Sequence, residues 1–207
     1  MRWDNLFDDL AGQLETGLDS EELTLRAEEE RLQIGRLTLR GRLTSLAGAR
    51  PASAGAAGAG RAVRIVLLSG DTLLLRPTAF GRDWLAADLL DAPARRVQCV
   101  LPLAGIAAVV LAPPVVAESL VAESERTARV SDRIGLPFVL RDLCRRRTTI
   151  DLSTPVGRLS GTIDRVGRDH LDLAVHEPGL PRRARNVSHV RVVPLQHIQL
   201  VRLGPSS

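Results

Sequence analysis

The chain has 207 residues, 44% of them hydrophobic, and a formal net charge of +4. This length and composition predict a globular protein with one large domain or two small ones, and the scarcity of aromatic residues predicts an aliphatic core. Residues 1–20 contain five acidic residues and no unbroken apolar run, which argues against a signal peptide. Three prolines and a glycine interrupt the most hydrophobic stretch, residues 97–117, which argues against a membrane span.

The chain begins with an acidic segment that precedes a basic body. Residues 1–47 contain ten acidic residues and six Arg, a net charge of −4, whereas residues 48–207 contain 14 acidic residues and 22 Arg, a net charge of +8. All 28 basic residues are Arg, which either reflects bidentate phosphate recognition or a GC-rich genome. Two isolated cysteines, Cys99 and Cys144, match no metal-site spacing and predict reduced thiols in a bacterial cytoplasm.

The acidic segment has the pattern of two helices. In the first helix the apolar side chains share one stripe, which predicts a partner-binding face. The residues of this stripe are Trp3, Leu6, Phe7, Leu10 and Leu14. Asp19 and Glu22 have the spacing of a capping box and predict a second helix over about 20–47.

Strands of alternating polarity follow, in two similar copies joined by a helical connector. "FGRDWL" (80–85) and "VGRDHL" (166–171) share Gly-Arg-Asp, and "VLPLAGI" (100–106) parallels "VVPLQHI" (192–198). Strands bounded by Gly, Pro and Asp at short intervals favour small β-barrels over parallel βαβ units. We therefore expect an α+β protein in which N-terminal helices precede two duplicated five-stranded barrels.

The expected organisation has five parts. They are an acidic helical arm at 1–47, a Gly/Ala-rich linker at 48–61, a first barrel at 62–112, a helical connector at 113–147 and a second barrel at 148–204. Each barrel should have five strands, at about 62–69, 71–80, 84–91, 96–102 and 106–111 in the first, and 148–153, 157–166, 170–176, 189–194 and 198–203 in the second.

The motif "VGRLSGTIDRVGRDHLDLAV" resembles the first motif of Sm-like proteins, and "VRVVPLQHIQLVRL" resembles their second. The resemblance covers about 50 residues of each copy and implies five bent antiparallel strands. It also implies RNA contacts in the turns at His170, Leu171 and Asp172 and at Leu195, Gln196 and His197. The base-reading Asn of that family is replaced by Asp172, which cannot donate a hydrogen bond.

Basic residues are concentrated in the second copy. An insertion carries Arg182, Arg183 and Arg185, and Arg191 lies on the strand that follows it. Such clusters neutralise phosphates, although a solvated loop in an Arg-rich chain has the same pattern. The candidate nucleic-acid-binding residues are Arg182, Arg183, Arg185, Arg191, His170, Gln196 and His197.

No sequence motif predicts catalysis. The chain lacks a G-x-S-x-G elbow, a Walker A loop, a G-x-G-x-x-G turn after a strand and the usual spacings of metal ligands. We therefore expect a non-enzymatic regulatory or RNA-associated protein without cofactor or metal, which contacts RNA or DNA through the second copy. The alternative is a protein-interaction or scaffold module that docks a partner through its N-terminal helix. The oligomeric state is open in both readings.

Overall fold

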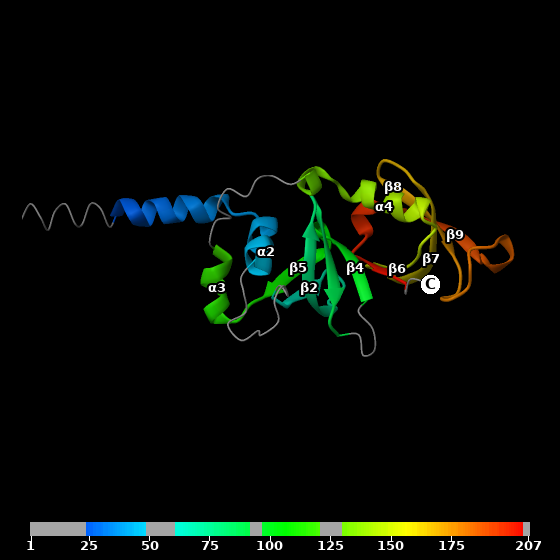
Figure 1. The fold of residues 1–207 in the computed structure, drawn as a ribbon, viewed down its shortest axis with the longest axis horizontal. Helices are drawn as coiled ribbons and strands as arrows, with labels where there is room; N and C mark the ends of the chain where they lie inside the picture. The colour runs from blue at the N-terminus through cyan, green and yellow to red at the C-terminus, as the bar shows by residue number, and fades with distance from the viewer. Residues whose placement is uncertain (1–23, 49–60, 92–96, 121–129, 205–207) are drawn as a thin grey trace, which may run out of the picture. The chain divides into compact units, whose positions relative to one another are not determined.

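The computed structural model describes residues 24–48, 61–91, 97–120 and 130–204 (Figure 1). The chain divides into two units, residues 1–38 and residues 39–207, and the strands among the described residues all belong to the second. The expected partner-binding stripe of Trp3, Leu6, Phe7, Leu10 and Leu14 and most of the 48–61 linker lie outside the described residues. No helix in the described part of the chain has the length and apolar character needed to cross a membrane.

The helix expected at 20–47 is interrupted. One helix occupies residues 24–36, and α2 (Leu39–Gly48) begins after a break at residues 37–38. The break follows Gly35, a poor helix former, and the Leu37 N–H bonds to the carbonyl of Ile34 at 3.1 Å, one residue closer than in an α-helix. The expected second helix is therefore two helices.

Ten antiparallel strands form a single open sheet with the order β5-β1-β2-β3-β4-β10-β6-β7-β8-β9 (Figure 1). The first half contains β1 (Val63–Leu67), β2 (Thr72–Phe80), β3 (Trp84–Leu89), β4 (Val97–Pro102) and β5 (Ile106–Val110). The second half contains β6 (Thr149–Thr154), β7 (Gly157–Val166), β8 (His170–Val175), β9 (His189–Pro194) and β10 (Leu200–Leu203). The strands lie close to where alternation and turn residues predict them.

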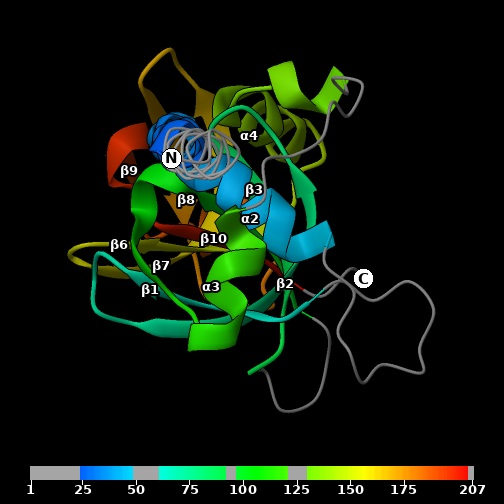
Figure 2. The ribbon, with the colours of Figure 1, turned by 90° about the vertical axis from the view of Figure 1, so that its left-hand side faces the viewer.

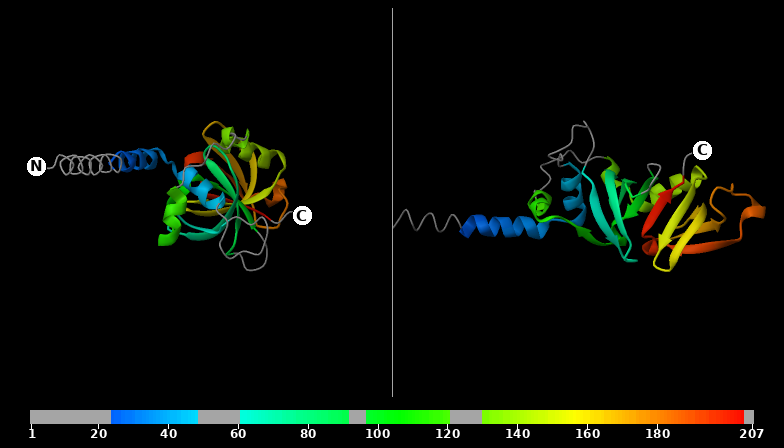
Figure 3. Two further views of the ribbon diagram at one scale, coloured as in Figure 1. Left: turned by 60° about the vertical axis from the view of Figure 1, so that its left-hand side comes forward. Right: turned by 90° about the horizontal axis from the view of Figure 1, so that it is seen from below.

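The prediction of two closed barrels is wrong. A closed barrel requires the fourth and fifth strands of one half to pair, but these strands are joined by the 3-10 turns η1 (Leu103–Gly105) and η4 (Leu195–His197) and do not pair with each other. Instead, β4 pairs with β10 of the other half, with Val100 opposite Val201 and Cys99 opposite Arg202. We call this pairing the junction; it joins both halves into one sheet (Figure 3).

The duplication is visible in the hydrogen bonds. In both halves the Gly-Arg-Asp turn closes when the glycine N–H (Gly81 or Gly167) bonds to the carbonyl three residues later at 2.8 Å. The aspartate carbonyls of the two turns accept bonds from Leu103 and Leu195 at the start of η1 and η4, at 2.9 and 2.8 Å. The repeated tripeptide is therefore a structural turn that fixes the same strand entry twice.

Helices cover each half. Helix α3 (Pro113–Leu120) packs beside α2 at the end of the first half, where Arg42 Nη2 donates to Ser119 Oγ at 2.7 Å (Figure 2). Helix α4 (Leu136–Arg145) follows the short turn η2 (Val130–Arg133) and packs on β7. Its first turn is capped by Asp83 of the first half, whose Oδ1 accepts the Leu136 N–H at 2.8 Å.

The junction strands separate two apolar cores. Cys99, Leu101 and Leu200 belong to the core of the first half, whereas Val100 and Val201 belong to the core of the second. Successive residues of a strand point to opposite faces, so one pair of strands contributes to both cores. Burial of these side chains makes the junction part of the folded unit rather than a loose contact.

Burial at the junction has a consequence for cysteine reactivity. Cys99 is buried, and burial raises the pKa of its thiol to about 12, whereas Cys144 is only half-buried. The thiolate is the species that reacts with alkylating reagents. Brief iodoacetamide treatment at pH 8 should therefore label Cys144 and leave Cys99 unmodified until urea unfolds the protein, as measured by peptide mass spectrometry. Equal labelling of both cysteines in the native protein would contradict this account of the junction.

Candidate functional site

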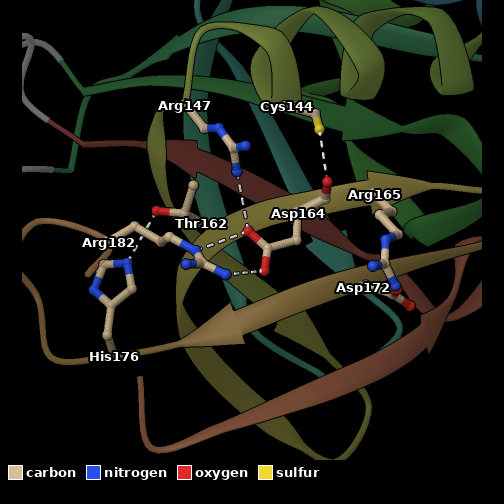
Figure 4. A network of polar contacts seen from close by, with 8 residues as sticks. All are labelled: Cys144, Arg147, Thr162, Asp164, Arg165, Asp172, His176 and Arg182. Atoms are coloured by element: carbon tan, nitrogen blue, oxygen red, sulfur yellow. Dashed lines mark hydrogen bonds and ion pairs between the residues drawn. The ribbon is translucent and has the colours of Figure 1, made fainter. Parts of the chain in front are cut away.

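Arg182, the first of the candidate arginines, is an internal ion-pair partner. Its Nε and Nη2 donate to Oδ1 and Oδ2 of Asp164 at 2.9 and 2.6 Å, and Arg147 Nη1 donates to the same Oδ1 at 3.1 Å (Figure 4). The Asp164 side chain is only 16% exposed. This bidentate bond attaches the loop between β8 and β9 to β7, so Arg182 is not the free loop cation that the sequence suggested.

Asp164 should give stability a defined pH dependence. Hydrogen bonding from Arg182 lowers the pKa of the carboxyl below its ordinary value of 3.8. A carboxyl with a depressed pKa stabilises the fold fully above its unfolded pKa and loses this contribution as the pH falls through the folded one. Asp164→Asn should therefore lower the melting temperature at pH 7, and the difference from the native chain should shrink below about pH 3.8.

Thermal melts monitored by circular dichroism at pH 7 and at pH 3 or below measure this difference. Glu177→Gln, on the exposed loop after β8, is the control and should have little effect at either pH. A difference between Asp164→Asn and the native chain that is the same at both pH values would contradict the ion-pair assignment.

Arg183 and Arg185 occupy an exposed turn. They flank Ala184 in the 3-10 turn η3 (Ala184–Asn186), and the Asn186 side chain holds the turn by donating to the Pro181 carbonyl at 2.8 Å. Within the described part of the chain neither arginine forms an ion pair. These two side chains therefore present positive charge to solvent.

The other four candidates lie on β9, just after its end and at the start of the neighbouring β8. Arg191 and His197 line one groove of about 260 Å³, and Gln196 is exposed beside His197. The remaining lining residues are Thr154, Pro155, Val156, Leu159, Val192, Val193 and Pro194. His170 pairs with Pro194 across β8 and β9, and its Nδ1 lies 2.8 Å from Asp169 Oδ1; hydrogen bonding to His170 lowers the pKa of Asp169. The seven candidates therefore occupy three places: the Asp164 ion pair, the η3 turn and the β9 edge.

Two apolar residues at this edge were not among the candidates. Val190 and Val192 on β9 are 53% and 65% exposed, and Val156 on the opposite wall of the groove is also exposed. Alternation along β9 was visible in the sequence, but it predicted only which residues share a face. The alternation did not predict that β9 would pair with β8 alone among the described strands.

The internal repeat provides a reference for this edge. Val100 of β4 holds the place in the first half that Val192 holds in the second, because Pro102 and Pro194 pair with Trp84 and His170 respectively. Val100 is only 5% exposed because β10 covers it. The same strand position is thus buried by a neighbouring strand in one half and open in the other.

The histidine at 176 belongs to the core rather than to a site. It is buried, with Nε2 2.9 Å from the Thr162 hydroxyl (Figure 4). Its Nδ1 lies 3.0 Å from the Glu177 carbonyl. A tautomer that donates from Nδ1 and accepts at Nε2 satisfies both contacts. In the described segments, no three His, Cys, Asp or Glu side chains are grouped so as to hold a metal ion.

Comparison with known proteins gives no match: no family model fits the chain, and no curated protein or solved structure is similar to it. The candidate site therefore rests on geometry. It is an open, largely apolar strand edge beside a groove, bordered by Arg191 and His197.

Proposed function

We propose that this chain is a non-enzymatic protein-interaction module that binds an extended segment of a partner along the β9 edge. The observation that carries the proposal is the contrast between Val192, which is 65% exposed, and Val100, its buried equivalent. An exposed apolar edge strand offers unpaired backbone groups and a surface for alternate side chains, which together bind an added strand. We place this activity in the cytoplasm, in keeping with two free thiols.

The shape of the edge supports a peptide more than a nucleic acid. The groove walls contain Val156, Leu159, Val192 and Pro194, and no Phe, Trp or Tyr side chain lines them. Single-stranded nucleic acids are usually held by aromatic stacking together with positive charge. Backbone pairing with β9 requires neither.

Selection of binding peptides tests the proposal directly. The full chain is immobilised and a random 12-residue peptide library is selected on it. We expect peptides whose binding is lost with Val192→Lys, because a lysine on an edge strand opposes strand addition. Val130→Lys, at another highly exposed valine that does not line the groove, is the matched control and should leave binding intact. Failure to select peptides, or peptides insensitive to Val192→Lys, would overturn the proposal.

Nucleic-acid binding through the second half is the second candidate, and the exposed pair Arg183 and Arg185 favours it. If this candidate is right, replacing Arg183, Arg185 and Arg191 together by Ala should weaken RNA binding and reduce the slope of log affinity against log salt by up to about three. Titration of a fluorescent single-stranded RNA at two salt concentrations measures both. Arg182 is left unchanged because its loss would disturb the Asp164 ion pair. No measurable RNA binding by the parent chain at low salt would eliminate this candidate.

A further inference from the structure

The junction shows what an added strand needs in order to fit beside the fourth strand of a half. In β10, three consecutive residues make the contact: Leu200 enters the core of the first half, Val201 lies opposite Val100, and Arg202 lies opposite Cys99. The two halves are repeats, so β9 presents the corresponding positions. Val192 stands in the place of Val100, and Arg191 in the place of Cys99.

From this template we infer that the partner segment of β9 carries two apolar residues followed by an acidic residue, in antiparallel register. This inference rests on the proposed function and specifies its ligand. The first apolar side chain takes the place of Leu200 and enters the groove between Val156, Leu159 and Val193. The second pairs with Val192, and the acidic side chain lies opposite Arg191.

The acidic residue is inferred from a difference in charge between β4 and β9, which have Cys99 and Arg191 at the same position. At the junction Arg202 faces Cys99, which is neutral because burial raises its thiol pKa. At β9, the residue of the partner segment that takes the place of Arg202 faces Arg191, which is exposed. Directly opposed like charges destabilise a strand pair, and opposite charges stabilise it.

A single strand fits this edge better than the sheet of a second copy of the chain. At the junction η1 approaches so closely that a Cβ on Gly105 would lie 2.8 Å from Gln199 Cα. The equivalent residue in the second half is His197, whose Cβ excludes the same approach. The β9 edge thus remains open to a free strand, while His197 hinders repetition of the junction.

Two peptides test the inference. One has the sequence of residues 196–204, and the other has Glu in place of the arginine that corresponds to Arg202. Fluorescence anisotropy with the native full chain should show the Glu peptide binding about three- to tenfold more tightly than the Arg peptide. The Arg191→Glu variant should reverse this preference, and Val192→Lys should abolish binding of both.

The outcomes separate this inference from the proposed function. Equal affinity of both peptides, or a preference that Arg191→Glu does not reverse, overturns the inferred motif. If the random library yields Val192-dependent peptides that lack an apolar-apolar-acidic sequence, the proposed function survives and the inferred partner chemistry fails. Sedimentation of the chain as an oligomer that Val192→Lys dissociates would identify a second copy as the occupant and also overturn the inference.

Discussion

Gly161→Ala is expected to destabilise the protein by about 3 kcal/mol, which lowers the melting temperature by about 6–12 °C for a chain of this size. Gly161 lies in the middle of β7, where it pairs with Ile150 on one side and Val175 on the other. A Cβ on this residue would lie 2.2 Å from the carbonyl oxygen of Ala174, and a backbone atom between two paired strands has little room to move. The substitution therefore forces β7 and β8 apart.

Thermal denaturation followed by circular dichroism measures this effect. The matched control is Gly35→Ala, because no heavy atom lies within 4 Å of a Cβ built there. Gly35 is also part of the helix at residues 24–36, where alanine is favoured over glycine. We expect the control to leave the main transition unchanged. A Gly161→Ala melt equal to that of the native chain would show that β7 and β8 are not packed as described.

The second large effect is expected at the junction. Gly105→Ala places a Cβ 2.8 Å from Gln199 Cα and 2.9 Å from the Gln199 carbonyl oxygen, so η1 must move away from the second half. We expect a loss of about 2 kcal/mol. Because the junction buries Cys99, the same substitution should also accelerate native-state alkylation of Cys99.

The internal repeat supplies the control for this substitution. His197 holds the position of Gly105 in the second half, is exposed and borders the groove. His197→Ala should leave both stability and Cys99 alkylation unchanged, since the residue lies outside the junction. Slow alkylation of Cys99 in Gly105→Ala, combined with native stability, would contradict the account of how the halves are joined.

Local features of the fold were predictable from the sequence. Each Gly-Arg-Asp turn, and the strands on either side of it, follow from the glycine, the alternating apolar residues and the bounding prolines. These signals act over a few residues, and the structure follows them. Helix α4 lies within the helical connector expected at 113–147, and Pro137 occupies its first turn.

Pairing between distant segments was not predictable in this way. Nothing local to β4 indicates whether it pairs with β5 or with β10, because both strands are apolar and both follow a short turn. The choice of pairing partner for β4 depends on the path of η1 and on the space that Gly105 leaves for Gln199. For this reason the sequence led to two closed barrels where the structure has one continuous sheet. The resemblance to Sm-like proteins remains a prediction.

The sequence was equally unable to predict which site residues contact segments that are distant in the chain. Arg182 belongs to a basic sequence cluster, but its role is set by Asp164, 18 residues earlier in the chain. Arg191 and His197 line one groove of the second half, yet the apolar character of this groove comes from Val156 and Leu159 on another hairpin. Charge along the sequence indicated a contact surface for phosphate, whereas burial in three dimensions favours a strand edge.

Hydrogen–deuterium exchange of the two equivalent strands tests the central claim most directly. β4 has strand neighbours on both sides, whereas β9 pairs with β8 alone among the described strands. In the free chain we therefore expect peptides covering residues 189–194 to exchange faster than peptides covering 97–102. Addition of the Glu-containing peptide should slow exchange at 189–194 toward the rate at 97–102, with no change at 97–102. Equal protection of both strands in the free chain, or exchange at 189–194 that no bound peptide slows, would contradict the assignment of β9 as a docking edge.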